Sequence, residues 1–246
     1  MNIEKLDIQF LKSKTVLVTG SSRGIGNAIT EKLLDLGNLV IGTSTKIESL
    51  NNLSSKFQRN FYPMELDLRS PESIRKLSVN INKQFESIDV LICNAGVLGD
   101  LSNLDSYNFQ VWCDTIDINL NNQLLLIQEV LPNIKKSNKG SIIITSSSVG
   151  QVPREKWGAY SISKYGMEGI STILSKELKN DHIIVNTVNP GGTATSMRKI
   201  AMPDEDHSTL PKPSDILPIF LYLCSNDAHE TGQSFNARDY IGLLNF

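Results

Sequence analysis

The sequence has few cysteines, few histidines and no long uninterrupted apolar run. Its 246 residues include three cysteines, Cys93, Cys113 and Cys224, and three histidines. An odd number of cysteines without a CxxC pair excludes a disulfide framework, and the scattered histidines exclude a zinc site of the cysteine-histidine type. No segment approaches the roughly 18 apolar residues that a membrane-spanning helix needs. We therefore expect no metal and no membrane association.

Neither sign of charge dominates. The chain contains 24 Lys and Arg residues and 26 Asp and Glu residues, which gives a formal net charge of -2. Such a chain has no broad positive field for a nucleic acid or an anionic membrane. The opening stretch MNIEKLDIQFLKSK lacks the apolar core, about 7 to 15 residues long, of a signal peptide. We expect a cytoplasmic protein that does not bind nucleic acid.

Aromatic residues are also few, at 7%, but the 40% hydrophobic and 20% charged residues are typical of a folded globular protein. No internal repeat or Ser/Gly linker divides the chain, and single α/β domains reach this length. We expect one domain over residues 1–246. The one irregular stretch is polar and contains proline, and it predicts a substrate lid at about 191–213.

Short Val- and Ile-rich runs alternate with stretches of helical spacing, which predicts an α/β fold with a parallel sheet. The runs are apolar nearly throughout, as in SIIIT, so we expect helices on both faces of a doubly wound, seven-stranded, mainly parallel sheet. The expected strands are 15–18, 39–42, 61–65, 90–93, 141–145, 183–188 and 234–236. The expected helices are 26–36, 71–85, 109–135, 160–179 and 213–224.

A glycine-rich turn directly follows the first expected strand. It reads Thr19-Gly20-Ser21-Ser22-Arg23-Gly24-Ile25-Gly26 and runs on into a helical stretch. Glycines permit a tight turn and a close approach to a phosphate, while the following helix offers free N–H groups to a pyrophosphate. A plain strand-to-helix turn is the alternative. The TGxxxGxG spacing resembles that of the short-chain dehydrogenase/reductase family, which implies a Rossmann-like fold and a nicotinamide cofactor.

The end of the second expected strand indicates which nicotinamide cofactor binds. An Asp or Glu there would hold the 2′-hydroxyl of NAD, whereas this chain has Thr43, Ser44 and Lys46. With Arg23 of the glycine turn, these groups suit the 2′-phosphate of NADP. We expect NADP(H) to be preferred, with NAD(H) as a second possibility; the alternative is that Arg23 and Lys46 are solvated surface charges.

A Tyr160-x-x-x-Lys164 pair begins an expected helix, where a spacing of four places both side chains on one face. Ser147 precedes it at the end of the strand SIIIT, and its order and spacing match the family's catalytic Ser-Tyr-Lys set, with Ser146 and Ser148 as bystanders. Asn119 in Asp-Ile-Asn-Leu matches the family's helix asparagine. Further ordered matches imply cofactor contacts: Asp67, Leu68, Asn94, Ala95, Gly96, Pro190, Gly191, Thr193 and Thr195, beside Gly20, Ser22, Arg23, Gly24, Ile25 and Gly26 of the turn.

The mechanism implied by the resemblance is hydride transfer between the nicotinamide and a carbonyl carbon. A phenol has an ordinary pKa of about 10, so Tyr160 needs a nearby ammonium, Lys164, to stabilise its phenolate. Ser147 polarises the carbonyl, Lys164 binds the nicotinamide ribose, and Asn119 fixes a water that relays protons. We expect an NADP-dependent oxidoreductase; the alternative is a non-catalytic NADP-binding sensor or scaffold.

The substrate is indicated less sharply. Much of the chain resembles β-ketoacyl-ACP reductases, which implies a 3-oxoacyl thioester, but the carboxyl part after Thr231-Gly232-Gln233 departs from them. The two arginines that dock the acidic carrier correspond to Asn138 and Asp181, and an unpaired Asp181 would repel it. A small ketone or a sugar derivative is the rival. Expected pocket residues are Ser147, Val152, Trp157, Tyr160 and Met197, although the apolar ones suit ordinary core packing equally well. The resemblance also implies a homotetramer or homodimer.

Overall fold

The computed structural model describes residues 13–243 and contains one seven-stranded sheet in which every neighbouring pair is parallel. The strand order is β3-β2-β1-β4-β5-β6-β7. The strands are β1 (Thr15–Val18), β2 (Leu39–Ser44), β3 (Phe61–Glu65), β4 (Val90–Cys93), β5 (Gly140–Thr145), β6 (Ile183–Asn189) and β7 (Ser234–Asn236). All seven expected strands are present, so the prediction of a doubly wound parallel sheet is confirmed.

Helices connect the strands, and their bounds differ in places from the expected ones. They are α1 (Gly24–Asp35), α2 (Asn51–Lys56), α3 (Pro71–Gln84), α4 (Phe109–Ile116), α5 (Asn122–Ile134), α6 (Gly158–Glu177), α7 (Ser196–Ala201) and α8 (Leu217–Cys224). The expected single helix over 109–135 is interrupted by a π-helical turn, η5 (Asp117–Asn121). The short helices α2 and α7 were not predicted, because one turn or two of helix carries too little periodicity to be recognised.

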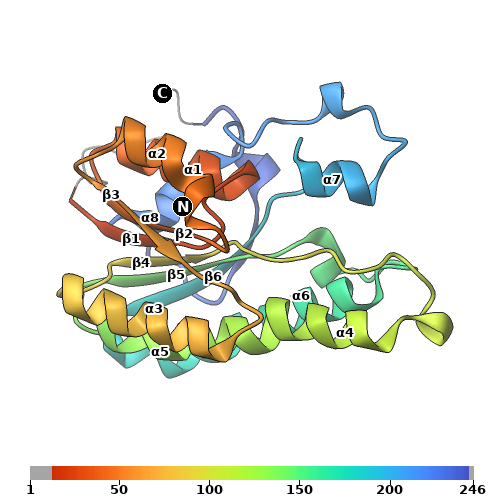
Figure 1. Ribbon diagram of the computed structural model, residues 1–246, viewed down its shortest axis with the longest axis horizontal. Helices are drawn as coiled ribbons and strands as arrows, with labels where there is room; N and C mark the ends of the chain where they lie inside the picture. The colour runs from red at the N-terminus through yellow and green to blue at the C-terminus, as the bar shows by residue number, and fades with distance from the viewer. Residues whose placement is uncertain (1–12, 244–246) are drawn as a thin grey trace.

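Helices cover both faces of the sheet, as Figure 1 shows. Alternate residues of each strand point to opposite faces. Val16 and Val18 of β1 therefore pack with α1 and α8, whereas Leu17 packs in the other layer with α3, α5 and α6. The two apolar layers explain why each strand is apolar nearly throughout.

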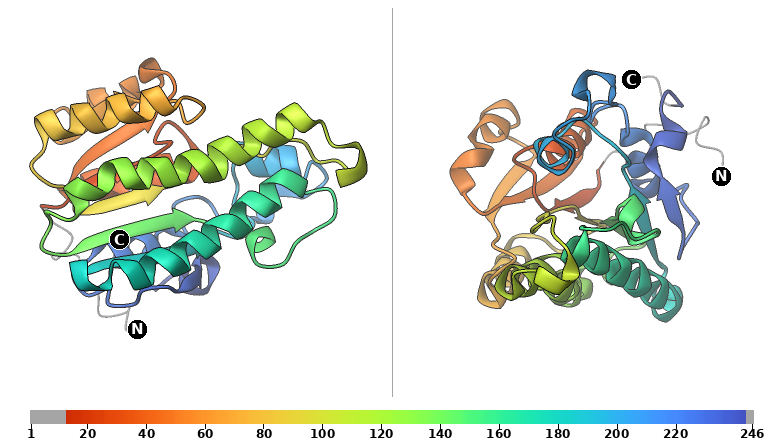
Figure 2. Two further views of the ribbon diagram at one scale, coloured as in Figure 1. Left: turned by 90° about the horizontal axis from the view of Figure 1, so that it is seen from below. Right: turned by 90° about the vertical axis from the view of Figure 1, so that its right-hand side faces the viewer.

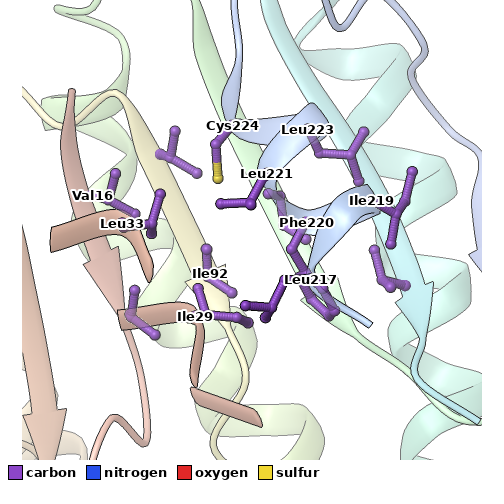
Figure 3. Packing of buried hydrophobic residues seen from close by; sticks show 14 of the residues in the cluster. Val16, Ile29, Leu33, Ile92, Leu217, Ile219, Phe220, Leu221, Leu223 and Cys224 are labelled. Carbon is purple, nitrogen blue, oxygen red and sulfur yellow. The ribbon is translucent and has the colours of Figure 1, made fainter. Parts of the chain in front are cut away.

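Helix α8 is buried along its whole length. Figure 3 shows its side chains, among them Phe220 and Leu221, over the same face of the sheet as Val16 and Ile92. Full burial explains its composition, because a helix that is apolar all round has no solvent face to supply. The helix therefore serves the packing of this face of the sheet.

Two features of the fold determine where a ligand can bind. Strand order reverses between β1 and β4, and in open α/β sheets ligands bind beyond the carboxyl ends of the strands at such a point. Figure 2 shows the combined α4–α5 helix running beside α6 and extending beyond the sheet with it. Among residues 13–243, no helix is long and apolar enough to cross a membrane, and no group of three or more His, Cys, Asp or Glu side chains is placed to hold a metal.

Candidate active site

The turn between β1 and α1 is closed tightly by its glycines. Gly20 and Gly24 have φ angles of +74° and +60°, in the left-handed region that other residues rarely adopt. A Cβ atom on Gly26 would overlap the carbonyl oxygen of Gly20. Within the described residues, no side chain caps the amino end of α1. The turn therefore presents bare backbone N–H groups, which suit a pyrophosphate.

Hydrogen bonds join the ends of β1 and β4 behind this turn. Thr19 Oγ1 accepts the backbone N–H groups of Asn94 at 2.9 Å and Ala95 at 3.0 Å, and Asn94 Nδ2 donates to the Thr19 carbonyl at 3.0 Å. Gln123, on α5, donates its Nε2 to the Ala95 carbonyl at 2.8 Å. The expected cofactor contacts Asn94 and Ala95 thus lie at the reversal of strand order. Gln123 was not predicted, because its partner lies in a distant part of the sequence.

The end of β2 lies beside the glycine turn, where the Ser21 N–H donates to the Thr43 carbonyl at 2.9 Å. The Thr43 side chain is buried, and Ser44 Oγ lies 2.8 Å from Ser49 Oγ. Arg23 and Lys46 are exposed. The two expected hydroxyls are therefore engaged or covered, and the two cations are the groups that a phosphate could reach.

Asp67, expected to contact the cofactor, has its carboxylate bound by Arg69. Arg69 Nη2 lies 2.7 Å from Asp67 Oδ2, and its Nε lies 3.0 Å from Oδ1. The hydrogen bond to the guanidinium lowers the pKa of Asp67. The next residue, Leu68, is buried, and its carbonyl accepts Asn122 Nδ2 at 2.7 Å. Arg69 was not predicted, because a pair two residues apart in a loop depends on loop geometry that no sequence pattern reveals.

Tyr160 and Lys164 lie one turn apart near the amino end of α6, and both are buried. Lys164 Nζ donates to the Thr145 carbonyl at 2.7 Å and lies 5.7 Å from the centroid of the Tyr160 ring. Ser147 follows β5, and its side chain lies near enough to the Tyr160 hydroxyl to oppose the rise in the pKa of Tyr160. The structure therefore brings the expected Ser-Tyr-Lys set together at the carboxyl end of β5.

The pKa values of this set differ from the expectation. Burial raises the pKa of Tyr160 to about 12, and the nearby Ser147 side chain only partly opposes this effect. Burial also lowers the pKa of Lys164 to about 8. In the protein alone, Tyr160 is thus a phenol at neutral pH, and desolvation outweighs any stabilisation of its phenolate by Lys164. A phenol that keeps its proton is a donor, as carbonyl reduction requires.

Asn119 lies in the π-helical turn that interrupts the α4–α5 helix. Its Oδ1 accepts the Val97 N–H at 2.9 Å, and its Nδ2 donates to the Val97 carbonyl at 2.7 Å and to Ser163 Oγ at 3.3 Å. A Cβ on Gly96 would lie 3.0 Å from Asn119 Oδ1. The side chain thus holds the loop after β4 against α6, and its expected role in a water relay stays a prediction.

A small apolar cluster surrounds the Tyr160 ring. It consists of Val149, Trp157, Tyr160 and Ala201, with Leu98, Leu101 and Met202 packed against them. The ring centroids of Trp157 and Tyr160 are 5.9 Å apart. Of the expected pocket residues, Trp157 and Tyr160 belong to this cluster, whereas Val152 is 74% exposed and Met197 is 36% exposed. The residues of the cluster come from three separate segments of the chain. A hydrophobic pattern within one segment does not reveal that the three meet.

The expected lid over 191–213 contains the helix α7 and contacts both halves of the site. Thr195 caps α7, and its Cγ2 would lie 3.6 Å from a Cβ on Gly24. Ala201, at the other end of α7, packs with Tyr160. Arg198 and Glu205 form a two-point ion pair at 2.6 Å and 2.7 Å that holds the segment together. The segment therefore reaches from the glycine turn to the tyrosine.

Sequence comparisons relate the chain to known proteins. The family model described as short chain dehydrogenase matches residues 14–206. The protein of Escherichia coli (strain K12) called uncharacterized oxidoreductase YciK is 36% identical over 235 residues, covering 93% of each chain. The 3-oxoacyl-[acyl-carrier-protein] reductase FabG of Vibrio cholerae is 32% identical over 235 residues, covering 92% of this chain and 96% of its own.

Solved structures share the fold of this chain. A short chain dehydrogenase of Shigella flexneri 2a str. 301, complexed with NADP, has a TM-score of 0.90 and 36% identity, covering 94% of this chain and all of its own. A short chain dehydrogenase of Escherichia coli CFT073, complexed with NADPH, has a TM-score of 0.90 and 35% identity, covering 95% of this chain and all of its own.

Proposed function

The chain belongs to the short chain dehydrogenase family, and on that premise we propose that it is an NADP(H)-dependent oxidoreductase interconverting a carbonyl compound and a secondary alcohol. One observation carries the proposal: a buried Tyr160, with Ser147 near its hydroxyl and Lys164 one helical turn away, lies within an apolar cluster at the carboxyl end of the sheet. Such a site can deliver a proton to a carbonyl oxygen while excluding water.

The glycine turn supports a dinucleotide as the cofactor. Its backbone cradle would be filled by a side chain at Gly26, and the amino end of α1 faces it without a side-chain cap among the described residues. Arg23 and Lys46 would bind the 2′-phosphate, which favours NADP(H) over NAD(H). The related structures complexed with NADP and NADPH support the same choice.

The protein groups would then act in sequence during reduction. When bound, NADPH supplies a hydride to the carbonyl carbon. Ser147 orients the carbonyl by hydrogen bonding to its oxygen. Tyr160, whose raised pKa of about 12 keeps it protonated, donates its proton to that oxygen as charge develops there. Lys164 as an ammonium offsets the negative charge that Tyr160 then carries.

The apolar cluster around Tyr160 bears on the substrate. Trp157, Leu98, Leu101 and Met202 present hydrocarbon and aromatic surface beside the proposed carbonyl position. Such surroundings favour an acyl chain or an apolar ketone, because a sugar would leave hydroxyl groups without partners there. The relatives named as 3-oxoacyl-carrier-protein reductases support the acyl class. We propose apolar ketones and 3-oxoacyl thioesters ahead of keto sugars.

The expected repulsion of a carrier protein by an unpaired Asp181 does not arise, because Asp181 is paired. Lys135 Nζ lies 2.8 Å from Asp181 Oδ2, and the pair is partly exposed. It lies where α5 ends and β6 is about to begin, at the amino edge of the sheet and away from Tyr160. A carrier docked there on a single copy would sit far from the proposed carbonyl site. A thioester that needs no docking, such as a coenzyme A ester, fits this geometry better.

The proposal is tested by measuring NADPH and NADH oxidation with a panel of an acetoacetyl thioester, apolar ketones, quinones and keto sugars. Turnover of an apolar member with NADPH is the expected result. Tight NADPH binding, followed by fluorescence, with no turnover across the panel would favour the non-catalytic sensor. Light scattering of the same sample tests the homotetramer or homodimer that the family implies, and fractionation of cells tests the proposed cytoplasmic location.

A further inference from the structure

One carboxylate near the site, that of Glu168, is surrounded by hydroxyl groups. Ser146 Oγ donates to Oε1 at 2.5 Å, Thr187 Oγ1 donates to Oε2 at 2.7 Å, and Ser234 Oγ donates to Oε1 at 3.1 Å. Gln151 Nε2 in turn donates to Ser234 Oγ at 2.7 Å. An ionised carboxylate accepts hydrogen bonds and donates none, so these three donors match it.

The three hydroxyls come from three parallel strands or their ends. Ser146 follows β5, Thr187 lies within β6, and Ser234 begins β7. Ser146 and Thr187 are buried, and Glu168 is half-buried on α6. Glu168 therefore ties α6 to three neighbouring strands at one point. Because Ser146 directly precedes Ser147, this tie also fixes the backbone that carries the carbonyl-orienting serine; Ser146 is more than the bystander that its motif predicts.

Glu168 also lies one helical turn after Lys164, on the same face of α6. The titratable groups that act on Lys164 are Cys93 from β4, Tyr160 one turn earlier and Glu168 one turn later. Burial raises the pKa of Cys93 to about 12 and that of Tyr160 to about 12, so both are neutral at physiological pH. Glu168 is therefore the charged member of the three that favours the ammonium form of Lys164.

We propose that Glu168 is a positioning residue of this active site: its carboxylate fixes the segment carrying Ser147 and holds Lys164 as an ammonium. The inference rests on the proposed function, because it assigns Glu168 a role through two residues of the proposed reaction. Glu168 itself contacts hydroxyls of the protein fold and acts only through Ser147 and Lys164.

Two substitutions separate the charge of Glu168 from its geometry. Glu168→Gln keeps the size and one acceptor oxygen, and the hydroxyls around it can rotate to accept from its amide, but the negative charge is lost. Glu168→Asp keeps the charge but withdraws it from the strands by one methylene. Glu177→Gln, an exposed position on the same helix away from the site, is the matched control.

The first readout is NADPH affinity between pH 6.5 and 9.5, measured by fluorescence, which needs no turnover. Affinity should fall in the wild type as Lys164 loses its proton, with a midpoint near its pKa of about 8. Removing a neighbouring unit charge shifts a pKa by about one unit. We therefore expect the midpoint to move down by about one pH unit in Glu168→Gln and to stay near the wild-type value in Glu168→Asp and Glu177→Gln.

An unchanged midpoint in Glu168→Gln, or an equal shift in Glu168→Asp, would overturn the inference, because a merely structural residue lowers affinity without moving the pH profile. The second readout is the pH profile of kcat with an active substrate, in which the alkaline decline should shift in the same way. Absence of any turnover by the wild type would refute the proposed function alone, since the affinity profile still tests Glu168.

Discussion

Lys164 Nζ donates a hydrogen bond to the backbone carbonyl of Thr145, so the ammonium is held by the last residue of β5 two positions before Ser147. The contact fixes α6 against the sheet at the point where the proposed chemistry takes place. It also places a charged group in a buried position, where desolvation dominates its pKa. Activity and stability therefore place opposite demands on this lysine.

Replacing Lys164 by methionine tests this opposition. Burial lowers the pKa of Lys164 from 10.5 to about 8, so the unfolded chain binds the proton more tightly than the folded protein does. The resulting destabilisation is fully present below pH 8 and disappears as the pH rises towards 10.5. We expect the stability of the wild type relative to Lys164→Met to rise by about 1 to 3 kcal/mol between pH 8 and 10. Urea unfolding at several pH values measures this difference, and Lys176→Met, at an exposed site on α6, should show no such trend.

Tyr160→Phe should remove the proton donor and little else. The ring remains within its apolar cluster, so we expect NADPH affinity to change by no more than about twofold, while kcat falls by about 10² to 10⁴. Steady-state turnover and a fluorescence titration give the two numbers. Normal turnover by Tyr160→Phe would refute the proposed mechanism.

Arg23→Ala should separate the two cofactors. A charge-assisted hydrogen bond contributes about 1.5 to 3 kcal/mol, so loss of its partner should weaken NADPH binding about 10- to 100-fold. NADH has no 2′-phosphate and should bind almost as well to the variant as to the wild type. The affinities of Arg23→Ala and Lys46→Ala for NADPH and for NADH are measured by titration. Equal losses of affinity for the two cofactors in Arg23→Ala would show that Arg23 does not contact the 2′-phosphate.

Gly26→Ala should damage the dinucleotide cradle itself. The added methyl group would overlap the carbonyl oxygen of Gly20 and crowd Asn94 Nδ2, so we expect a loss of about 1 to 3 kcal/mol in unfolding free energy and a loss of NADPH binding. Gly169→Ala is the matched control. Outside the backbone of its own helix, no atom of the described residues lies within 4 Å of the added Cβ. Alanine also favours a helix over glycine by about 1 kcal/mol. Thermal unfolding with and without NADPH compares the two variants, and equal stability of both would contradict the close approach.

The strands were predictable from sequence, whereas several site contacts were not. The buried runs around Val16 and Ile143 are apolar on both faces, and that pattern by itself indicates a parallel sheet covered on both sides. The π-helical turn at Asn119 is harder to recognise, because it appears in the sequence only as a one-residue slip in helical phase between two short helices.

Interactions between charged groups were predicted least well from the sequence. The motif places Tyr160 beside Lys164, so the ammonium was expected to lower the pKa of Tyr160. The motif carries no information on burial, and burial raises that pKa. Likewise, Asp67 pairs with Arg69 and Asp181 pairs with Lys135, although each acid was expected to be available. Pairing between side chains depends on how loops and helix ends approach in space, which spacing along the chain does not specify.

The hydrogen bonds at Glu168 also determine when this part of the site can be completed during protein synthesis. Thr19 can bind Asn94 once the first half of the chain has been made, so the dinucleotide cradle can assemble early. Ser234, which completes the hydroxyls around Glu168, is synthesised 140 residues after Asn94, roughly 7 to 28 s later at about 5 to 20 residues per second. Until then the carboxylate of Glu168 lacks its hydroxyl partner from β7. The complete set of contacts that holds α6 to the three strands therefore forms only when translation has reached the last strand.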